Sequence, residues 1–261
     1  MKYRFRIVSL LLTALLLSSG CGFFGEKEDK TRNWTAVRLY NEAKSQMENG
    51  NFDTAIDYYE KLESRFPFGI YSQQAQLDVA YAYYKYDEPA SAIAAAERFI
   101  KLHPRHPNVD YAYYLKGLVH FSEGKGLLDR FLPRDRSRRD PGAARQAFDA
   151  FSELVRRFPD SKYAEDAAQR MLYLKNTLAQ HEVHVANYYM RRGAYVAAAN
   201  RARYVVENYQ RTPAVPEALV VMAKAYKVMG LNELASDAMR VLKHNYPDHE
   251  GIAEVEKLEV E

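Results

Sequence analysis

The sequence is poor in the features that define several large protein classes. It has a single cysteine, which excludes a framework of paired disulfides. Its longest mainly apolar run, residues 7–17, has 11 residues, about half of the ~20 that a membrane-spanning helix needs. The formal net charge is only +3, from 37 basic and 34 acidic residues, without the basic excess of a nucleic-acid-binding protein. We therefore expect no disulfide, no permanent transmembrane helix and no nucleic-acid partner.

Sequence motifs for catalysis are also missing. There is no Gly-x-Ser-x-Gly elbow, no phosphate-binding loop and no dinucleotide fingerprint. His181 and His184 stand one helical turn apart, and His103 and His106 flank a proline, spacings that can bind a metal. Neither pair has a nearby cysteine or a third ligand, so we interpret all four as surface histidines. The sequence predicts no metal, no cofactor and no enzymatic activity.

The N-terminus has the three parts of a secretory signal peptide. Basic residues precede the apolar run, small residues follow it, and Cys21 comes next. The segment Leu17-Ser-Ser-Gly-Cys21 resembles the bacterial lipobox, in which the cysteine is acylated and becomes the mature N-terminus. It departs from that motif at Ser18, where a leucine is usual. The alternative is an ordinary signal peptide with an incidental thiol.

The lipobox resemblance implies a compartment. It predicts a signal peptide at 1–20, a covalent lipid on Cys21, and a short tether over 21–32. Several acyl chains on one residue are enough for stable anchoring. Residue 22 is Gly and not the Asp that is associated with the inner membrane, so the resemblance implies an outer-membrane protein that faces the periplasm.

The rest of the chain contains an internal repeat. Four three-residue segments end in proline, and a small residue lies twelve positions before each proline. In three of these units another small residue lies twelve positions further upstream. A fifth unit has the same pair of small residues, with Asn208-Tyr209-Gln210 in place of the segment that ends in proline. In the unit that ends at Pro159, Gly117 fits the first small position, and an insertion displaces the second. The prolines are Pro67, Pro104, Pro159 and Pro247, and the other small residues are Ala43, Ala55, Ala80, Ala92, Ala147, Ala186, Ala198, Ala223 and Ala235.

This spacing has a physical cause in paired helices. Two antiparallel helices pack closely only where both have small side chains at the crossing. Gly50, Gly193 and Gly230 lie midway between the small residues, where a helix ends in the left-handed conformation, and each proline stops the second helix. The pattern resembles the tetratricopeptide repeat of about 34 residues, with a step of 37 here. The predicted fold class is all-α, a tetratricopeptide-repeat solenoid of about five helix pairs.

The expected helices follow from this phasing. The pairs are about 33–49 with 51–65, 72–86 with 88–102, 108–122 with 141–157, 181–192 with 194–209, and 214–229 with 232–245. Residues 161–192 contain no proline and no glycine, so one long helix is expected to bridge the third and fourth units. This divides the chain into an N-terminal half at 33–160, a C-terminal half with the bridging helix at 161–250, and a tail at 251–261. The insertion at about 121–140 alternates arginines with Asp135 and Asp140, which indicates a solvated loop with local ion pairs, and an anion site is the alternative.

The first helix of each unit lines the concave face of such a stack, which is an extended binding surface. The residues expected to face inward combine aromatic rings, amides and lysines, so we predict a groove for an extended peptide or a chain terminus. These residues are Tyr40, Asn41, Lys44, Gln74, Asp78, Tyr81, Lys85, Tyr111 and Tyr114. The alternative is that half of these tyrosines simply pack between neighbouring units.

Longer phrases resemble one known family. Residues 65–85 read Arg-Phe-Pro-Phe-Gly-Ile-Tyr-Ser-Gln-Gln-Ala-Gln-Leu-Asp-Val-Ala-Tyr-Ala-Tyr-Tyr-Lys. Further matching phrases are His106-Pro-Asn-Val-Asp-Tyr111, Asp135-Arg-Ser-Arg-Arg-Asp-Pro141 and Tyr188-Tyr-Met-Arg-Arg-Gly-Ala194. The chain resembles the BamD (ComL) family, the lipoprotein subunit of the outer-membrane β-barrel assembly machinery, over essentially its whole mature length.

The resemblance implies a scaffold without enzymatic activity that helps to fold and insert outer-membrane proteins. Its N-terminal units would bind unfolded outer-membrane proteins through their C-terminal segments. Its C-terminal units would dock the periplasmic repeats of the barrel-forming subunit, and other accessory lipoproteins would lie along the stack. The family's Asn-Arg pair that contacts the barrel subunit is Asn200 and Arg201 here, with a solvent-facing arginine as the alternative. The competing function is another repeat-type periplasmic lipoprotein, such as a pilotin-like factor for secretion-channel assembly.

Overall fold

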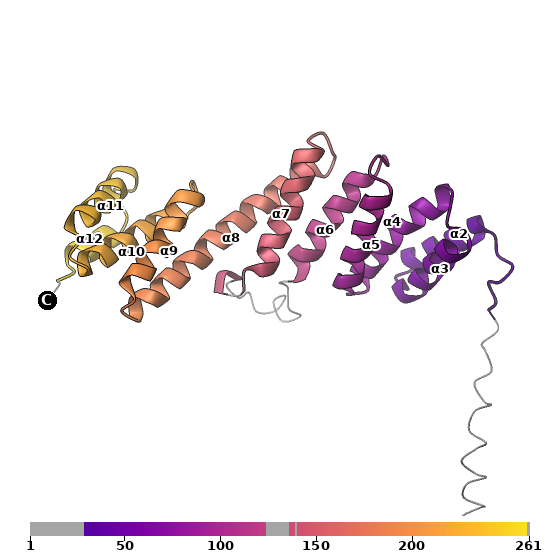
Figure 1. The fold of residues 1–261 in the computed structure, drawn as a ribbon, viewed down its shortest axis with the longest axis horizontal. Helices are drawn as coiled ribbons and strands as arrows, with labels where there is room; N and C mark the ends of the chain where they lie inside the picture. Colours follow the sequence, from indigo (N-terminus) through magenta and orange to yellow (C-terminus); the bar gives the residue numbers. More distant parts are fainter. Residues whose placement is uncertain (1–28, 124–135, 139, 260–261) are drawn as a thin grey trace, which may run out of the picture.

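The computed structural model describes residues 29–123, 136–138 and 140–259. Within these ranges the chain is α-helical, with one short 3-10 helix and no strand. The helices follow one another in chain order along the long axis of the molecule, with α2 and α3 at one end and α11 and α12 at the other (Figure 1). The predicted signal peptide, Cys21 and most of the predicted insertion lie outside the described residues.

The helices of the described ranges form five antiparallel pairs, which confirms the predicted fold class. Each helix packs on the next along the chain, and the first helices of neighbouring pairs also touch, as in α2 with α4, α4 with α6, and α8 with α10. The pairs are α2 (Ala36–Glu48) with α3 (Phe52–Arg65), α4 (Ile70–Lys85) with α5 (Pro89–Leu102), α6 (Val109–Glu123) with α7 (Gly142–Arg157), α8 (Ala164–Arg191) with α9 (Tyr195–Asn208), and α10 (Val215–Val228) with α11 (Asn232–Asn245).

The small residues of the repeat lie at the helix crossings. All ten of them are buried, nine as alanines and one as Gly117. A Cβ atom at Gly117 would lie 2.3 Å from the Phe151 ring, so α6 and α7 touch there without room for a side chain. The regular spacing of the small residues therefore marks the places where helices pack closely, as the sequence predicted.

The turns inside the pairs use the left-handed backbone conformation. Gly50, Gly193 and Gly230 have φ of 80°, 72° and 71°. The residue after each glycine donates its N–H to a carbonyl five residues earlier, as Asn51 does to Gln46 at 2.9 Å. This is the hydrogen-bond pattern of a helix C-terminus that ends on a left-handed residue. The second pair makes the same turn at Asp87, with φ of 65°.

Replacing Asp87 with glycine is expected to raise the free energy of unfolding by about 0.5–1 kcal/mol, because glycine adopts φ > 0 without the steric cost that an L side chain has there. The reverse change in the equivalent turn, Gly230→Ala, is expected to lower it by about 1 kcal/mol. Thermal unfolding of both variants measures the two effects. If both variants shifted the melting temperature in the same direction, backbone strain at Asp87 would not be the cause.

The second helices end before prolines, as predicted. The helices α3, α5, α7 and α11 end two residues before Pro67, Pro104, Pro159 and Pro247. The residue that directly precedes each proline has left the helical conformation, for example Phe66 with φ of −130° and ψ of 67°. This fits the steric clash between a proline ring and a preceding helical residue.

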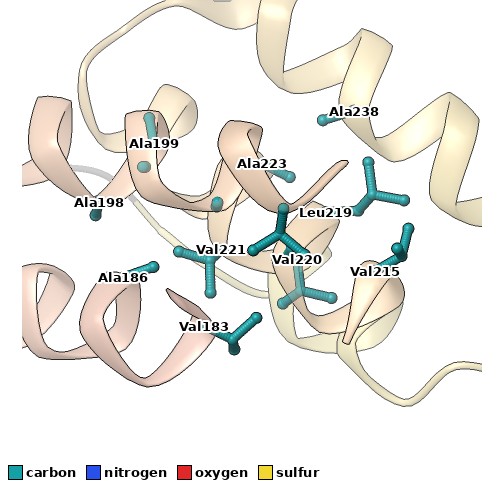
Figure 2. Close-up of a cluster of buried hydrophobic side chains, with 14 of the residues drawn as sticks. Val183, Ala186, Ala198, Ala199, Val215, Leu219, Val220, Val221, Ala223 and Ala238 are labelled. Atoms are coloured by element: carbon teal, nitrogen blue, oxygen red, sulfur yellow. The ribbon is translucent and has the colours of Figure 1, made fainter. Parts of the chain in front are cut away.

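The bridging helix α8 has 28 residues, which corresponds to a length of about 42 Å. Its Leu174 belongs to a core that also contains Phe99 and Phe151. Its Val183 and Ala186 belong to the core of the C-terminal pairs, where they face α9 and α10 (Figure 2). One continuous helix therefore contributes to the cores on both sides of it, and the division into two halves stays a prediction.

Two segments differ from what the sequence indicated. Residues 251–261 were expected to form a tail, but Gly251–Glu256 form the helix α12. Gly251 and Val255 are buried, and α12 packs on α10, so these residues continue the stack. In the insertion, Arg136–Arg138 form the 3-10 helix η2, which packs on α8, and His181 Nδ1 donates to the carbonyl oxygen of Ser137 at 2.7 Å. For α12, a repeat alignment does not indicate that the apolar Val255 packs against α10.

Candidate functional site

The predicted groove centres on the carboxylate of Asp78. The Tyr40 hydroxyl on α2 donates to Asp78 Oδ2 at 2.9 Å, and Gln74 Nε2 on α4 donates to Asp78 Oδ1 at 2.8 Å. The Lys44 ammonium lies close enough to favour the charged carboxylate. Four of the nine predicted groove residues therefore meet at one place between α2 and α4. Helical spacing puts Gln74 and Asp78 one turn apart on the same face, while the Tyr40 contact needs the stacking of two repeats.

Burial is the main influence on this carboxylate. It raises the pKa of Asp78 above the ordinary value of 3.8, while the hydrogen bonds from Gln74 and Tyr40 and the charge of Lys44 oppose the rise. Burial and the neighbouring Asp78 also raise the pKa of the Tyr40 phenol. The folded protein thus binds a proton at Asp78 at a pH where the unfolded chain has already lost it.

We expect the stability of an Asp78→Asn variant, relative to the wild type, to rise as the pH increases from 4 to 7. A raised folded pKa gives a stabilising contribution below the ordinary pKa that is lost as the pH rises through the folded value. Asparagine has no proton to lose, and its amide oxygen still accepts from Tyr40. Urea unfolding of both chains at each pH gives the difference in unfolding free energy.

Asp166 provides a control for which the expected change of stability with pH has the opposite sign. The hydrogen bond from Arg170 holds the pKa of Asp166 below its usual range, assisted by the hydrogen bond from Tyr114. Its contribution to stability is present above the unfolded pKa and is lost as the pH falls through the folded value. An Asp166→Asn variant should therefore lose stability relative to the wild type as the pH rises. Equal slopes for the two variants would contradict both assignments.

A second cluster extends the groove to the start of α8. The Tyr114 hydroxyl donates to Asp166 Oδ2 at 2.6 Å, and its ring stacks on Tyr163 with a centroid distance of 4.7 Å. Burial and the bond to Asp166 raise the pKa of Tyr114 to about 12. Tyr111 also packs on Tyr163, at 5.4 Å. Sequence reasoning missed Tyr163, Asp166 and Arg170 because it named inward-facing residues only in the first three units and treated the segment before residue 181 as a bridge between units.

The predicted groove residues differ in their exposure. Asn41 and Lys44 are exposed on α2, and Tyr81 is partly buried on α4 beside Tyr84. The Lys85 ammonium lies 5.8 Å from the centre of the Phe52 ring, so it extends toward the turn between α2 and α3. The carboxylates of the groove already accept hydrogen bonds from the protein, which leaves ring faces, Asn41 and Lys44 to meet a ligand. The groove as a set stays a prediction.

The second surface surrounds the predicted Asn200 and Arg201 on α9. Arg201 Nη1 donates to Glu182 Oε2 at 2.9 Å, and Arg145 Nη2 on α7 donates to Glu182 Oε1 at 3.0 Å. The Glu182 side chain on α8 is 1% exposed, while the side chains of Arg145 and Arg201 are 52% and 47% exposed. One buried carboxylate therefore orients two arginines from two different repeats. We name Arg145, Glu182 and Arg201 the arginine clamp.

The arginine clamp borders a hollow of about 480 Å³. Its other lining residues are Tyr189, Ala197, Asn200 and Tyr204. Asn200 is exposed, and its side-chain oxygen accepts from Arg203 at 2.9 Å. Half-exposed arginines whose second hydrogen-bonding edge faces a hollow can bind a carboxylate from another chain. This arrangement fits an acidic side chain rather than a small apolar ligand.

Sequence reasoning placed Arg201 here but missed Arg145 and Glu182. Glu182 was noticed only as part of a phrase too short for a zinc-protease helix. The signal that could have found it is its position four residues before Ala186, which puts a charged residue on the buried face of α8. A buried carboxylate needs paired partners, and two arginines within reach supply them.

Neither a metal cluster nor a membrane-spanning helix accompanies these surfaces. Among the described residues, no three His, Cys, Asp or Glu side chains are placed to hold a metal ion. The helices of the same ranges are too short or too polar to cross a membrane. Two of the predicted surface histidines, His103 and His106, are partly buried. His103 Nε2 is 2.8 Å from Gln76 Oε1, and the His106 ring packs on Phe99.

Comparison with known proteins gives consistent matches. The profile of a family described as "YfiO: Outer membrane lipoprotein" matches residues 32–242. A Neisseria meningitidis serogroup A protein named outer membrane protein assembly factor BamD is 51% identical over 217 residues, covering 83% of this chain and 81% of that protein. The Vibrio cholerae protein of the same name is 38% identical over 234 residues, covering 90% and 96%. A solved thermophilic TPR protein of Thermus thermophilus is similar with a TM-score of 0.37 and 15% identity, covering 86% of this chain and 100% of that one.

Proposed function

Because this chain belongs to the YfiO family of outer-membrane lipoproteins, whose relatives in Neisseria and Vibrio are outer membrane protein assembly factors named BamD, we propose that it serves outer-membrane protein assembly as a lipid-anchored scaffold. The observation that carries the proposal is the extent of the match. The family profile spans residues 32–242, from just before α2 into α11, so it includes both surfaces described above. A scaffold of this kind works by binding, with no chemical step.

The N-terminal surface is the proposed site for unfolded outer-membrane proteins. Its tyrosine rings, with exposed Asn41 and Lys44 beside them, suit an extended chain whose backbone pairs with an amide and whose terminal carboxylate meets an ammonium. The hydrogen bonds of Asp78 and Asp166 hold the tyrosines in fixed positions. Such preorganisation lowers the entropy cost of binding a flexible peptide.

The C-terminal surface is the proposed docking site for the barrel-forming subunit. Arg201 and Asn200 would contact an acidic residue of its periplasmic repeats, with Glu182 holding Arg201 in place. Other accessory lipoproteins of the same machine would bind elsewhere along the stack. Both surfaces use α8, but Asp166 and Glu182 lie about 24 Å apart along its axis, which leaves room for both partners to bind at the same time.

The membrane attachment is proposed at Cys21. A lipid on this residue would place the chain at the inner leaflet of the outer membrane, facing the periplasm. Asp29, the first described residue after it, and Thr31 both bind Arg65 at the end of α3, whose Nη1 donates to the Thr31 carbonyl at 2.6 Å. Mass spectrometry of the mature N-terminus tests the anchor, and an unacylated Cys21 would remove it.

Affinity purification from detergent-solubilised envelopes tests the proposed function. With a C-terminal tag, the chain should recover the barrel-forming subunit together with other accessory lipoproteins. The tagged Cys21→Ser chain serves as a matched control, because it keeps both binding surfaces and lacks only the acylated thiol. Recovery of a secretin without any barrel-assembly subunit would contradict the proposal and would favour a pilotin-like factor.

A further inference from the structure

The turn between α3 and α4 exposes two large apolar side chains. Phe68 is 91% exposed and Ile70 is 75% exposed, the two highest exposed fractions among the large apolar residues that the structure describes. Residues 66–70, which we name the apolar turn, contain no charged residue. An apolar pair in this position costs solvation free energy unless something covers it.

The apolar turn is held in one conformation by its own backbone. Gly69 has φ of 108°, which an L side chain rarely adopts, and Pro67 fixes its own φ. The Ser72 hydroxyl donates to the Pro67 carbonyl at 3.1 Å, and the Gln73 N–H donates to the Gly69 carbonyl at 3.1 Å. Phe68 and Ile70 are therefore presented outward by a constrained turn, which lowers the entropy lost on binding.

The chain that leads to Cys21 is fixed directly beside this turn. Arg65, one residue before the apolar turn, binds Asp29 and donates to Thr31 Oγ1 at 3.0 Å, and Thr31 is buried. Cys21 precedes Asp29 by eight residues, and a chain of that length spans at most about 28 Å. Any surface that holds Cys21 is therefore within about 28 Å of Asp29, and the apolar turn lies next to Asp29.

We propose that the apolar turn inserts Phe68 and Ile70 into the phospholipid surface of the membrane, as a second contact beside the lipid on Cys21. The inference rests on the proposed function, because it takes the acylated Cys21 as the first contact. Covalent attachment keeps the turn at a high local concentration near the lipid, so two apolar side chains suffice. Exposed Lys30 and Arg32 flank the buried Thr31 and would meet anionic headgroups.

The contact is tested with an indole placed in the turn. Trp34 is the only tryptophan of the chain, so Trp34→Phe removes the background and Phe68→Trp adds one reporter. Cys21 is the only cysteine, so residues 21–261 can be coupled through it to a maleimide lipid in vesicles of phosphatidylethanolamine and phosphatidylglycerol. The acylated protein purified from envelopes forms a parallel arm. In both arms we expect emission at shorter wavelength and quenching by brominated acyl chains.

A matched control uses another exposed apolar residue. Val196 on α9 is 64% exposed and lies in the fourth helix pair, so Val196→Trp in the same Trp34→Phe background should show neither the shift nor the quenching. Absence of quenching at position 68, or equal quenching at both positions, would overturn the inference. The fluorescence of the maleimide-coupled chain does not depend on natural acylation, and the co-purification of assembly partners does not depend on the apolar turn. Failure of the membrane contact and failure of the proposed function can therefore be distinguished.

A second measurement removes the apolar side chains. Partition onto the same vesicles of the chain coupled through Cys21 to a single myristoyl group, whose own membrane binding is reversible, should fall about tenfold for Phe68→Asp and again for Ile70→Asp, because each variant replaces a membrane-inserted apolar group with a charge. Val196→Asp should leave the partition unchanged. Unchanged partition of the doubly substituted turn, with helical circular dichroism intact, would also overturn the inference.

Discussion

A chain in which valine replaces Gly117 is expected to lose about 3 kcal/mol of unfolding free energy, because the crossing of α6 and α7 has no room for a side chain. A Cβ atom there would lie 2.3 Å from Cε1 of Phe151 and 2.4 Å from its Cδ1. The Phe151 ring is fully buried and packs against Tyr114 and Phe121, so it cannot move away without disturbing both. Urea unfolding followed by far-ultraviolet circular dichroism measures the loss.

Two further variants show whether the cause is the tight crossing. Gly142→Ala, at the start of α7, puts a Cβ atom at an ordinary 3.4 Å from Asp140, so its unfolding free energy should stay within about 0.5 kcal/mol of the wild type. Combining Gly117→Ala with Phe151→Leu should cost less than the sum of the two single changes, since the smaller side chain makes space. A Gly117→Val chain as stable as the Gly142→Ala control would refute the close packing.

Replacing Arg201 with glutamate is expected to weaken docking of the barrel-forming subunit about tenfold or more, and to destabilise the C-terminal pairs by about 2 kcal/mol. The second effect arises because Arg201 is one of the two partners of the buried Glu182. The substitution removes that partner and places a second carboxylate beside the first. Surface plasmon resonance with the periplasmic repeats of the subunit measures docking, and thermal unfolding measures stability.

Docking and folding are separated by two neutral substitutions. Arg201→Met and Arg145→Met each leave Glu182 with one arginine, and the two arginines are similarly exposed, so their effects on stability should be similar. If Arg201 itself contacts the subunit, only Arg201→Met should weaken docking strongly. Equal docking losses would indicate that the variants act through Glu182, and wild-type docking of the Arg201→Glu chain would exclude the site.

The helical stack could be predicted because its determinants are local. A small residue at each crossing, glycine at the left-handed turns and proline after the second helix are requirements that repeat at fixed spacing, so they appear as periodicity. Even the pair whose turn has Asp87 in place of glycine keeps its phase, since the alanines on either side are unchanged. The helix α12 escaped prediction because its burial depends on the shape of α10 and not on its own sequence.

The pairing of polar side chains could not be predicted in the same way. Tyr40 was expected to face a ligand, and whether its hydroxyl meets Asp78 instead depends on the offset between α2 and α4. Glu182 binds arginines from α7 and α9, which lie 37 residues before it and 19 after it in the sequence. Such contacts depend on how repeats stack, so a pattern within one repeat does not contain them.

The unbroken course of α8 has a mechanical consequence. Asp166 at the groove and Glu182 in the arginine clamp are on the same helix, about 24 Å apart along its axis. A helix without proline or glycine has no hinge and curves only gently. The groove and the clamp are therefore held at a fixed separation by one continuous helix, with no hinge between Asp166 and Glu182 to absorb a displacement of either end.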